Sequence, residues 1–121
     1  LVEDEPALRK LTAAMLEREG YSVLEASDGV DALQMLAEHD GRVHLVLSDI
    51  IMPRIGGPEL AARAAAKWPS LPFVFMSGYI DESLGQSRSL AAETAFLPKP
   101  FTREQLARKM REVLERTEAA A

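Results

Sequence analysis

Short apolar runs suited to buried strands alternate along this chain with segments of helical periodicity. The runs lie at residues 22–26, 43–47, 73–76 and 95–97, and helical patterns or turn residues separate each from the next. Nearly continuous apolar strands joined through helices are typical of a parallel sheet that helices cover on both faces. The alternation therefore predicts an α/β fold with three layers, in which a doubly wound, five-stranded parallel sheet lies between two layers of helices.

The predicted helices follow from the spacing of apolar residues and from residues that start or stop a helix. Pro6 suits the first helical position, which needs no N–H, and Gly20 ends the first helical pattern. Thr102 and Gln105 form a capping box at the start of the last helix. Residues 79–94 contain a glycine and several serines, so any helix there is weak. The predicted helices cover residues 6–20, 30–40, 58–68 and 102–116.

Length and composition limit what the chain can be. The 121 residues suit one domain, to which we assign residues 1–116, with residues 117–121 as a frayed tail. The first strand is represented only by Leu1 and Val2, so we expect its beginning to be missing. The absence of cysteine excludes a disulfide framework and a thiolate zinc site. A net charge of −5 argues against direct nucleic-acid binding, and the lack of a long apolar stretch or signal peptide favours the cytoplasm.

Polar side chains follow the predicted strands at the point where each strand ends. Glu3 and Asp4 follow the first strand, Asp49 the third, Ser77 the fourth and Lys99 the fifth. The carboxyl ends of the strands in an open parallel sheet meet at one edge, where ligands bind. The sequence therefore predicts three carboxylates, a hydroxyl and an ammonium group at one edge of the sheet.

This set of groups suits phosphoryl chemistry with a divalent cation. Crowded carboxylates raise one another's pKa unless a cation lies between them. A few hard oxygen ligands with room for water suit Mg²⁺, which could orient a phosphoryl group. A carboxylate such as Asp49 can attack phosphorus and form an acyl phosphate. Lys99 would then face the new negative charge, and Ser77 could donate a hydrogen bond to a phosphoryl oxygen.

Four segments together carry a resemblance to a known family. VEDE, LVLSDIIMP, FMSGY and LPKPF, in this order and spacing, resemble the receiver domain of two-component response regulators. The resemblance covers essentially the whole chain, and it implies a flavodoxin-like sheet with strand order 2-1-3-4-5. The combination of MSGY with LPKPF resembles receivers attached to hybrid sensor histidine kinases.

The resemblance implies a role for each residue of the predicted edge. Asp49 would be the phosphoacceptor, and Lys99 would contact the phosphoryl group. Asp4 and Asp49 would bind Mg²⁺ through their side chains, Glu3 mostly through water, and Ile51 through its backbone carbonyl.

Further residues would form the switch. Ser77 would be the switch hydroxyl, and Phe96 would occupy the aromatic switch position. Phenylalanine cannot donate a hydrogen bond, so this switch would work by packing alone. The resemblance also implies a cis peptide bond between Lys99 and Pro100, and X-Pro bonds are the only ones for which cis is cheap.

The implied partner is a histidine kinase or a histidine phosphotransfer domain, and no nucleic acid or membrane contact is expected. The surface formed by the fourth helix, fifth strand and fifth helix would change on phosphorylation, and it could also carry a homodimer. Each residue has a plainer explanation when taken alone: acids favour helix starts, Asp49 could begin a turn, and Lys99 could be an exposed loop lysine.

Two other functions remain open. One is a magnesium-dependent phosphohydrolase that forms an aspartyl phosphate, although such enzymes commonly carry an aspartate at the position of Ile51. The other is a docking module that works without phosphorylation. We expect a self-phosphorylating switch rather than an enzyme with turnover.

Overall fold

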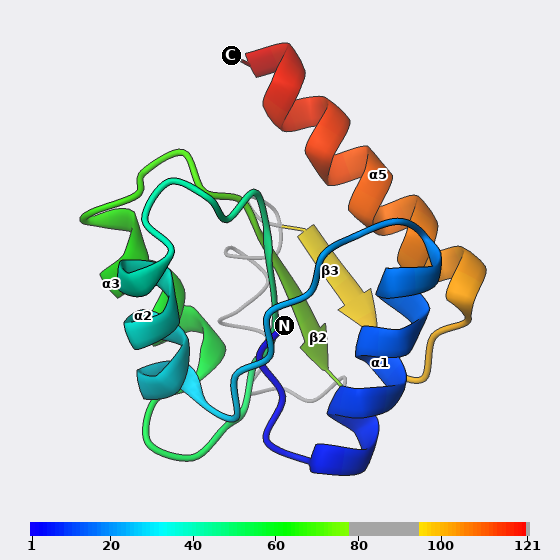
Figure 1. The fold of residues 1–121 in the computed structure, drawn as a ribbon, viewed down its shortest axis with the longest axis horizontal. Helices are drawn as coiled ribbons and strands as arrows, with labels where there is room; N and C mark the ends of the chain where they lie inside the picture. The colour runs from blue at the N-terminus through cyan, green and yellow to red at the C-terminus, as the bar shows by residue number, and fades with distance from the viewer. Residues whose placement is uncertain (78–94, 121) are drawn as a thin grey trace.

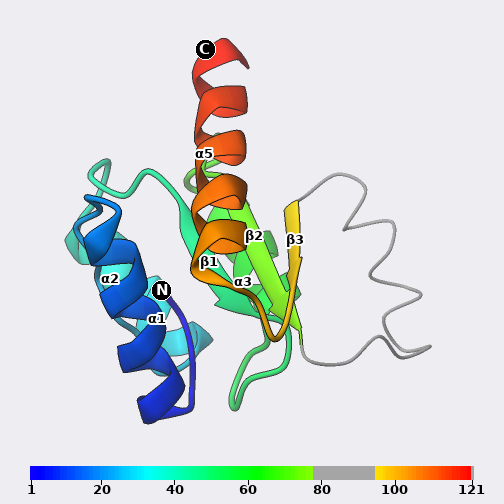
Figure 2. The same ribbon diagram turned by 90° about the vertical axis from the view of Figure 1, so that its right-hand side faces the viewer.

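The computed structural model describes the backbone of residues 1–77 and 95–120 and the side chains of residues 1–77 and 95–116. In this part of the chain, helices cover both faces of a parallel sheet (Figure 1). Helices α2 and α3 pack together on one face, and α1 and α5 lie on the other (Figure 2). The elements are α1 (Pro6–Arg18), α2 (Gly29–Glu38), β1 (Val46–Asp49), α3 (Gly57–Ala65), β2 (Phe73–Ser77), β3 (Ala95–Pro98) and α5 (Arg103–Ala120). The predicted three-layer α/β arrangement is confirmed.

The sheet has the strand order that the resemblance implied. Strands β1, β2 and β3 are neighbours in that order and run parallel. Val2 forms parallel bridges to Ala26 on one side and to Ser48 on the other. Its amide donates to the carbonyl of Leu47 at 2.8 Å, and the amide of Glu3 donates to the carbonyl of Ala26 at 3.0 Å. The first segment of the chain therefore lies between the second segment and β1, as in the order 2-1-3-4-5.

Two predicted strand boundaries were wrong. The strand expected over residues 22–26 forms a β-bridge only at Ala26, because its hydrogen bonds with residues 1–3 are confined to Leu24 and Ala26. The strand expected over residues 43–47 is Val46–Asp49, so it is shifted toward Asp49. Pairing with β2 decides this boundary, because Val46 is opposite Phe73 and Asp49 is opposite Met76.

The ends of the helices follow the expected signals. Pro6 occupies the first turn of α1. Thr102 and Gln105 form the predicted capping box, with the Thr102 amide donating to Gln105 Oε1 at 2.8 Å and the Gln105 amide donating to Thr102 Oγ1 at 3.1 Å. Helix α5 continues through residues 117–120, where we predicted a frayed tail. The segment predicted to hold a weak fourth helix lies outside the described residues, and no helix in the described part is long and apolar enough to cross a membrane.

The core consists of two apolar clusters, one on each face of the sheet. Alternation along β2 sends Phe73 and Phe75 to the cluster with α2 and α3, and Val74 and Met76 to the cluster with α1 and α5. All residues of β1 and β2 are buried, because both faces are covered. Polar residues at the carboxyl ends of these strands are therefore held rigidly at one edge.

Candidate functional site

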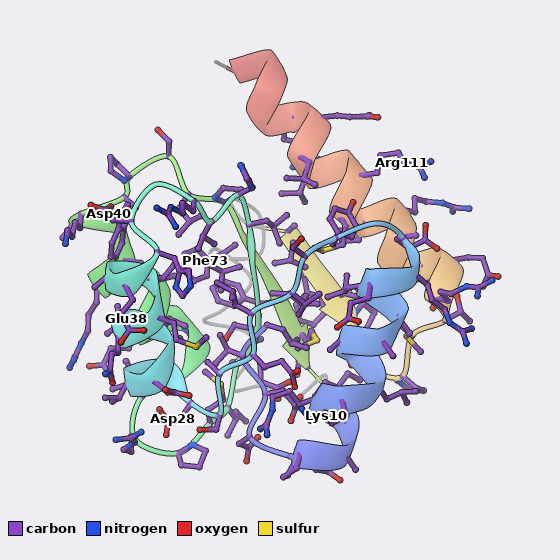
Figure 3. All side chains as sticks on the ribbon, viewed as in Figure 1. Lys10, Asp28, Glu38, Asp40, Phe73 and Arg111 are labelled. Carbon is purple, nitrogen blue, oxygen red and sulfur yellow. The ribbon has the colours of Figure 1, made fainter. Side chains whose placement is uncertain are left out.

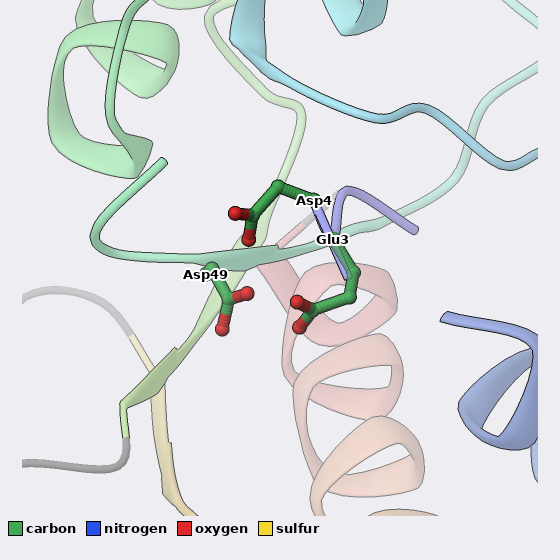
Figure 4. A group of neighbouring side chains, drawn as sticks. All are labelled: Glu3, Asp4 and Asp49. Atoms are coloured by element: carbon green, nitrogen blue, oxygen red, sulfur yellow. The ribbon is translucent and has the colours of Figure 1, made fainter. Parts of the chain in front are cut away.

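Three acidic side chains meet at the carboxyl edge of the sheet. Asp49 is the last residue of β1, and Glu3 and Asp4 directly follow Val2, which pairs beside β1. One carboxylate oxygen from each of the three lies within 4.8 Å of the others. Their carboxylates point toward a common region in Figure 4. The sheet therefore gathers the acidic residues that the sequence placed at strand ends.

Lys99 joins two of these carboxylates. Its Nζ lies 2.5 Å from Asp49 Oδ1 and 2.9 Å from Glu3 Oε2. The lysine side chain is 19% exposed, whereas those of Asp49 and Glu3 are 9% and 3% exposed. Because all three groups are largely shielded from water, their attraction is stronger than that of a surface ion pair. The ammonium of Lys99 therefore provides the positive charge that holds the acidic cluster together.

The two buried carboxyl groups share one proton unequally. Burial and the neighbouring Glu3 raise the pKa of Asp49 to about 7, although Lys99 acts in the opposite direction. Burial by itself would raise the pKa of Glu3, but hydrogen bonds with Asp49 and Lys99 lower it overall. Burial would likewise lower the pKa of Lys99, but its bonds to Asp49 and Glu3 raise it. Asp49 therefore binds a proton more readily than Glu3, and in the metal-free domain it ionises as the pH rises through about 7.

Glu3 and Asp4 differ sharply in their surroundings. Glu3 is buried, and its Oε1 accepts a hydrogen bond from the Glu5 amide at 3.1 Å. Asp4 is exposed at the edge of the cluster. Hard carboxylate oxygens that converge beside an exposed residue leave room for water, which is the setting that Mg²⁺ prefers. The donor set therefore fits a small divalent cation.

Ser77 and Phe96 lie on neighbouring strands beside this cluster. Ser77 ends β2, is buried, and its carbonyl accepts a hydrogen bond from the Lys99 amide at 2.8 Å. Phe96 is opposite Phe75 in the β2–β3 register and packs, partly buried, against the core cluster on the α2 and α3 face. Ser77 thus lies at the same edge as Asp49, whereas Phe96 lies deeper in the sheet.

The loop from β1 to α3 completes the edge. Ile51 is 74% exposed beside Asp49, and Gly57 begins α3 directly under the end of β1. A Cβ atom on Gly57 would overlap the carbonyl oxygen of Asp49, so only glycine allows this approach. The peptide bond between Lys99 and Pro100 is cis, as the resemblance implied.

Comparison with known proteins agrees with this arrangement. The sequence pattern of the response regulator receiver domain matches residues 1–111. The chain belongs to this family. Receiver domains are the phosphoacceptor domains of two-component signal transduction, and this chain is therefore such a domain.

The relatives of this receiver domain include parts of longer proteins. It is 40% identical over 116 residues to the sensor kinase CckA of Brucella abortus, a match that covers 96% of this chain and 12% of that kinase. It is 34% identical to the response regulator MprA of a Mycobacterium strain (KMS), over 97% of this chain and 50% of that protein. The chain therefore spans half or less of the length of these relatives.

Solved structures give the same result. The receiver domain of the hybrid histidine kinase CckA is 39% identical, with a TM-score of 0.78, over 93% of this chain and 94% of that one. A CheY-like receiver domain protein from Methanospirillum hungatei JF-1 is 30% identical, with a TM-score of 0.84, over 99% of this chain and 94% of that one. These similarities extend across nearly the whole receiver fold.

The sequence analysis missed one ion pair near the site of the receiver domain. Arg54, in the loop after β1, binds Asp28 at the start of α2. Asp28 lies between the apolar run at residues 22–26 and the helix predicted from residue 30, and an aspartate in that position is a common N-cap. That signal could have identified Asp28 as a helix cap, but nothing in the sequence connects it to Arg54.

Proposed function

We propose that Asp49 is the residue that accepts the phosphoryl group from a phosphohistidine of a histidine kinase or histidine phosphotransfer domain. One observation carries the proposal: Lys99 Nζ lies 2.5 Å from Asp49 Oδ1 and 2.9 Å from Glu3 Oε2. A cation held against the acceptor carboxylate can also pair with the oxygens of an incoming phosphoryl group. Asp49 lies at the end of a buried strand, so it presents its carboxylate at a fixed position.

Mg²⁺ is the cofactor that this site fits. Asp4 and Asp49 would hold it through carboxylate oxygens, Ile51 through its backbone carbonyl, and Glu3 mostly through water. When bound, the metal supplies positive charge that offsets the charge of the phosphoryl oxygens. Positive charge at this site would favour the ionised carboxylate of Asp49, which is the form that can act as a nucleophile.

The transfer step exchanges one bond to phosphorus for another. An Asp49 Oδ attacks phosphorus and forms the new O–P bond, while the N–P bond of the phosphohistidine breaks. The electron pair of that bond stays on the imidazole nitrogen of the donor, and the product on this chain is an acyl phosphate. Lys99 faces the added negative charge throughout.

The acyl phosphate would act as a switch. The Ser77 hydroxyl donates a hydrogen bond to a phosphoryl oxygen, and the packing of Phe96 changes. Phosphorylation thus shifts an equilibrium between two arrangements of the surface near β3 and α5. That surface would serve protein partners or a homodimer, with no nucleic acid or membrane contact.

The parent protein is best explained as a cytoplasmic hybrid histidine kinase with this domain over residues 1–116. The similarity to the sensor kinase CckA supports this, because it reaches 40% identity. The exposed Ile51 argues against a phosphohydrolase, since an apolar side chain cannot act as acid or base.

Acetyl phosphate provides a direct test. The wild type, incubated with acetyl phosphate and Mg²⁺, should give a shifted band on a phosphate-affinity gel, and EDTA should abolish the shift. Asp49→Asn should give no shift, whereas Asp40→Asn should behave as wild type. Asp40 is an apt control because its carboxylate is exposed and accepts a hydrogen bond from Trp68 Nε1 at 2.6 Å, which is a contact separate from the acidic cluster. Labelling of Asp49→Asn would contradict the assignment, and no labelling of wild type would favour a docking module.

A further inference from the structure

The loop between β1 and α3 is fixed at its two ends. The Ile50 amide donates to the Met76 carbonyl at 3.1 Å, and the Gly57 amide donates to the Ile50 carbonyl at 2.8 Å. These bonds hold the loop where it leaves the sheet and where it enters α3. They do not include residues 51–55, of which Ile51 is exposed whereas Met52 and Ile55 are buried in the core. Between these two buried residues, Arg54 makes a further contact.

Arg54 ties the middle of the loop to helix α2. Its Nε donates to Asp28 Oδ2 at 2.8 Å, and its Nη2 lies 2.6 Å from the same oxygen. The other oxygen, Oδ1, accepts from the Asp31 amide at 2.8 Å as the N-cap of α2. Figure 3 labels Asp28 at this end of α2. One carboxylate therefore caps the helix and holds the loop.

The backbone around Arg54 fits α2 closely. Arg54 has a φ of 68°, in the left-handed region that glycine adopts more readily. The next residue, Ile55, is buried, and a Cβ atom on Gly29 would overlap its side chain. The loop can thus approach the first turn of α2 only with this local geometry. The ion pair with Asp28 offsets the conformational cost of holding the Arg54 backbone in this region.

We propose that Arg54 and Asp28 position the backbone carbonyl of Ile51 for the divalent cation, an inference that rests on the metal site of the proposed function. Only Met52 and Pro53 separate Ile51 from Arg54. Met52 is buried at 9% exposure, and the ring of Pro53 fixes its φ. Little freedom remains between the two positions, so a displacement of Arg54 would be transmitted to the Ile51 carbonyl. Arg54 and Asp28 are positioning residues and do not touch the cation.

The direction in which two substitutions change the affinity for Mg²⁺ distinguishes a positioning role from a simple effect of charge. Arg54→Gln removes a positive charge near the site, so electrostatics alone would strengthen cation binding. Asp28→Asn removes a negative charge and would weaken it, while the amide oxygen still caps α2. Positioning predicts that both substitutions weaken binding. It also predicts that the double variant binds no more weakly than either single variant, because one link is broken in all three.

The test is a Mg²⁺ titration of the ¹⁵N-labelled chain, followed through amide chemical shifts. Arg54→Gln and Asp28→Asn should each raise the Kd for Mg²⁺ by about threefold to tenfold, a modest effect because the pair is partly exposed. Arg54→Lys keeps the charge but loses the two-nitrogen contact with Asp28, so its Kd should lie between those of wild type and Arg54→Gln. Arg63→Gln removes a comparable exposed pair with Glu59, 3.3 Å apart on α3, and should leave the Kd unchanged.

Amide exchange without metal gives a second readout. Exchange at the amides of Ile51, Met52 and residue 54 should be faster in Asp28→Asn and Arg54→Gln than in wild type, and unchanged in Arg63→Gln. Tighter Mg²⁺ binding by Arg54→Gln, or additive effects in the double variant, would overturn the positioning role. If the wild type binds no Mg²⁺, the metal site of the proposed function is wrong. If the wild type binds Mg²⁺ but the variants bind it equally well, only the positioning role of Arg54 and Asp28 is wrong.

Discussion

Lys99 Nζ lies 2.5 Å from Asp49 Oδ1, so the ammonium at the end of β3 is directly paired with the carboxylate at the end of β1. The β2 strand lies between these two strands, and its last residue, Ser77, accepts a backbone hydrogen bond from Lys99. The carboxylate, the ammonium and the residue that carries the hydroxyl are thus held at the ends of three adjacent strands.

Asp49→Asn should stabilise the metal-free domain at pH 8. The pKa of Asp49 is raised by burial and by Glu3 to about 7, above its ordinary value of 3.8. The folded state therefore binds this proton more tightly than the unfolded state, and the resulting stability is present at low pH and lost as the pH rises through 7. Asparagine does not ionise, so the free energy of unfolding of the variant should exceed that of wild type by a difference that grows from pH 5 to pH 8 and reaches about 2 kcal/mol.

Urea denaturation in EDTA at the two pH values measures this difference in the free energy of unfolding. Asp40→Asn provides the control, because its carboxylate is exposed at the far end of α2. A pH-independent difference between Asp49→Asn and wild type would contradict the shared proton. Added Mg²⁺ should stabilise the wild type at pH 8 and should have a much smaller effect on Asp49→Asn.

Lys99→Ala should slow labelling and abolish the conformational response. The variant loses a charge-assisted contact to the phosphoryl group, which corresponds to about a tenfold to hundredfold lower labelling rate by acetyl phosphate. Amide spectra recorded with beryllofluoride, a mimic of the phosphoryl group, should shift for wild type and remain unchanged for the variant. Lys67→Ala, which removes the ammonium above the Trp68 ring, should respond as wild type does. A full spectral change in Lys99→Ala would show that the conformational response does not need this lysine.

Ile51→Asn should shorten the lifetime of the acyl phosphate. The Ile51 side chain is exposed beside Asp49 and offers no hydrogen bond to an attacking water. An asparagine could orient that water, and one hydrogen bond of about 1 kcal/mol corresponds to about a fivefold faster decay. Decay is followed on phosphate-affinity gels after removal of acetyl phosphate, with Ile51→Val as the apolar control. Equal decay in wild type and Ile51→Asn would rule out this explanation of the side chain.

Gly57→Ala should impair both folding and labelling. The new Cβ would overlap the carbonyl oxygen of Asp49, and it would also lie 3.1 Å from the Phe75 ring. Such overpacking costs about 1–3 kcal/mol of the free energy of unfolding. The same displacement should slow labelling, because it moves the end of β1. Gly20→Ala is the matched control: its φ of 95° makes alanine strained, but no atom lies within 4 Å of the new Cβ, so labelling should be unaffected.

The positions of the acidic residues were predictable because strand ends in a parallel sheet share an edge. Glu3, Asp49 and Lys99 each follow an apolar run, and the structure brings all three into contact. The sequence did not reveal that Glu3 would be buried and paired directly with Lys99. That depends on how closely the first segment packs beside β1, which a residue pattern does not encode.

The Asp28–Arg54 ion pair lay beyond sequence reasoning for a different reason. An arginine can reach many partners, and the left-handed backbone at Arg54 decides which one it meets. The strand expected over residues 22–26 failed similarly, because strand length depends on how much partner backbone is available rather than on local apolar character.

Phe96 and Leu97 are adjacent in β3, yet they belong to the two different core clusters. A turn of the Phe96 ring would therefore first disturb the layer that contains α2 and α3. Helix α5 packs with Leu97 on the opposite side, so the movement of the Phe96 ring would affect α5 only through a shift of the β3 main chain. A change in the packing of Phe96 would thus reach α5 through the sheet itself. The rigidity of β3 would then limit how far the helices on the two faces of the sheet could move independently of each other.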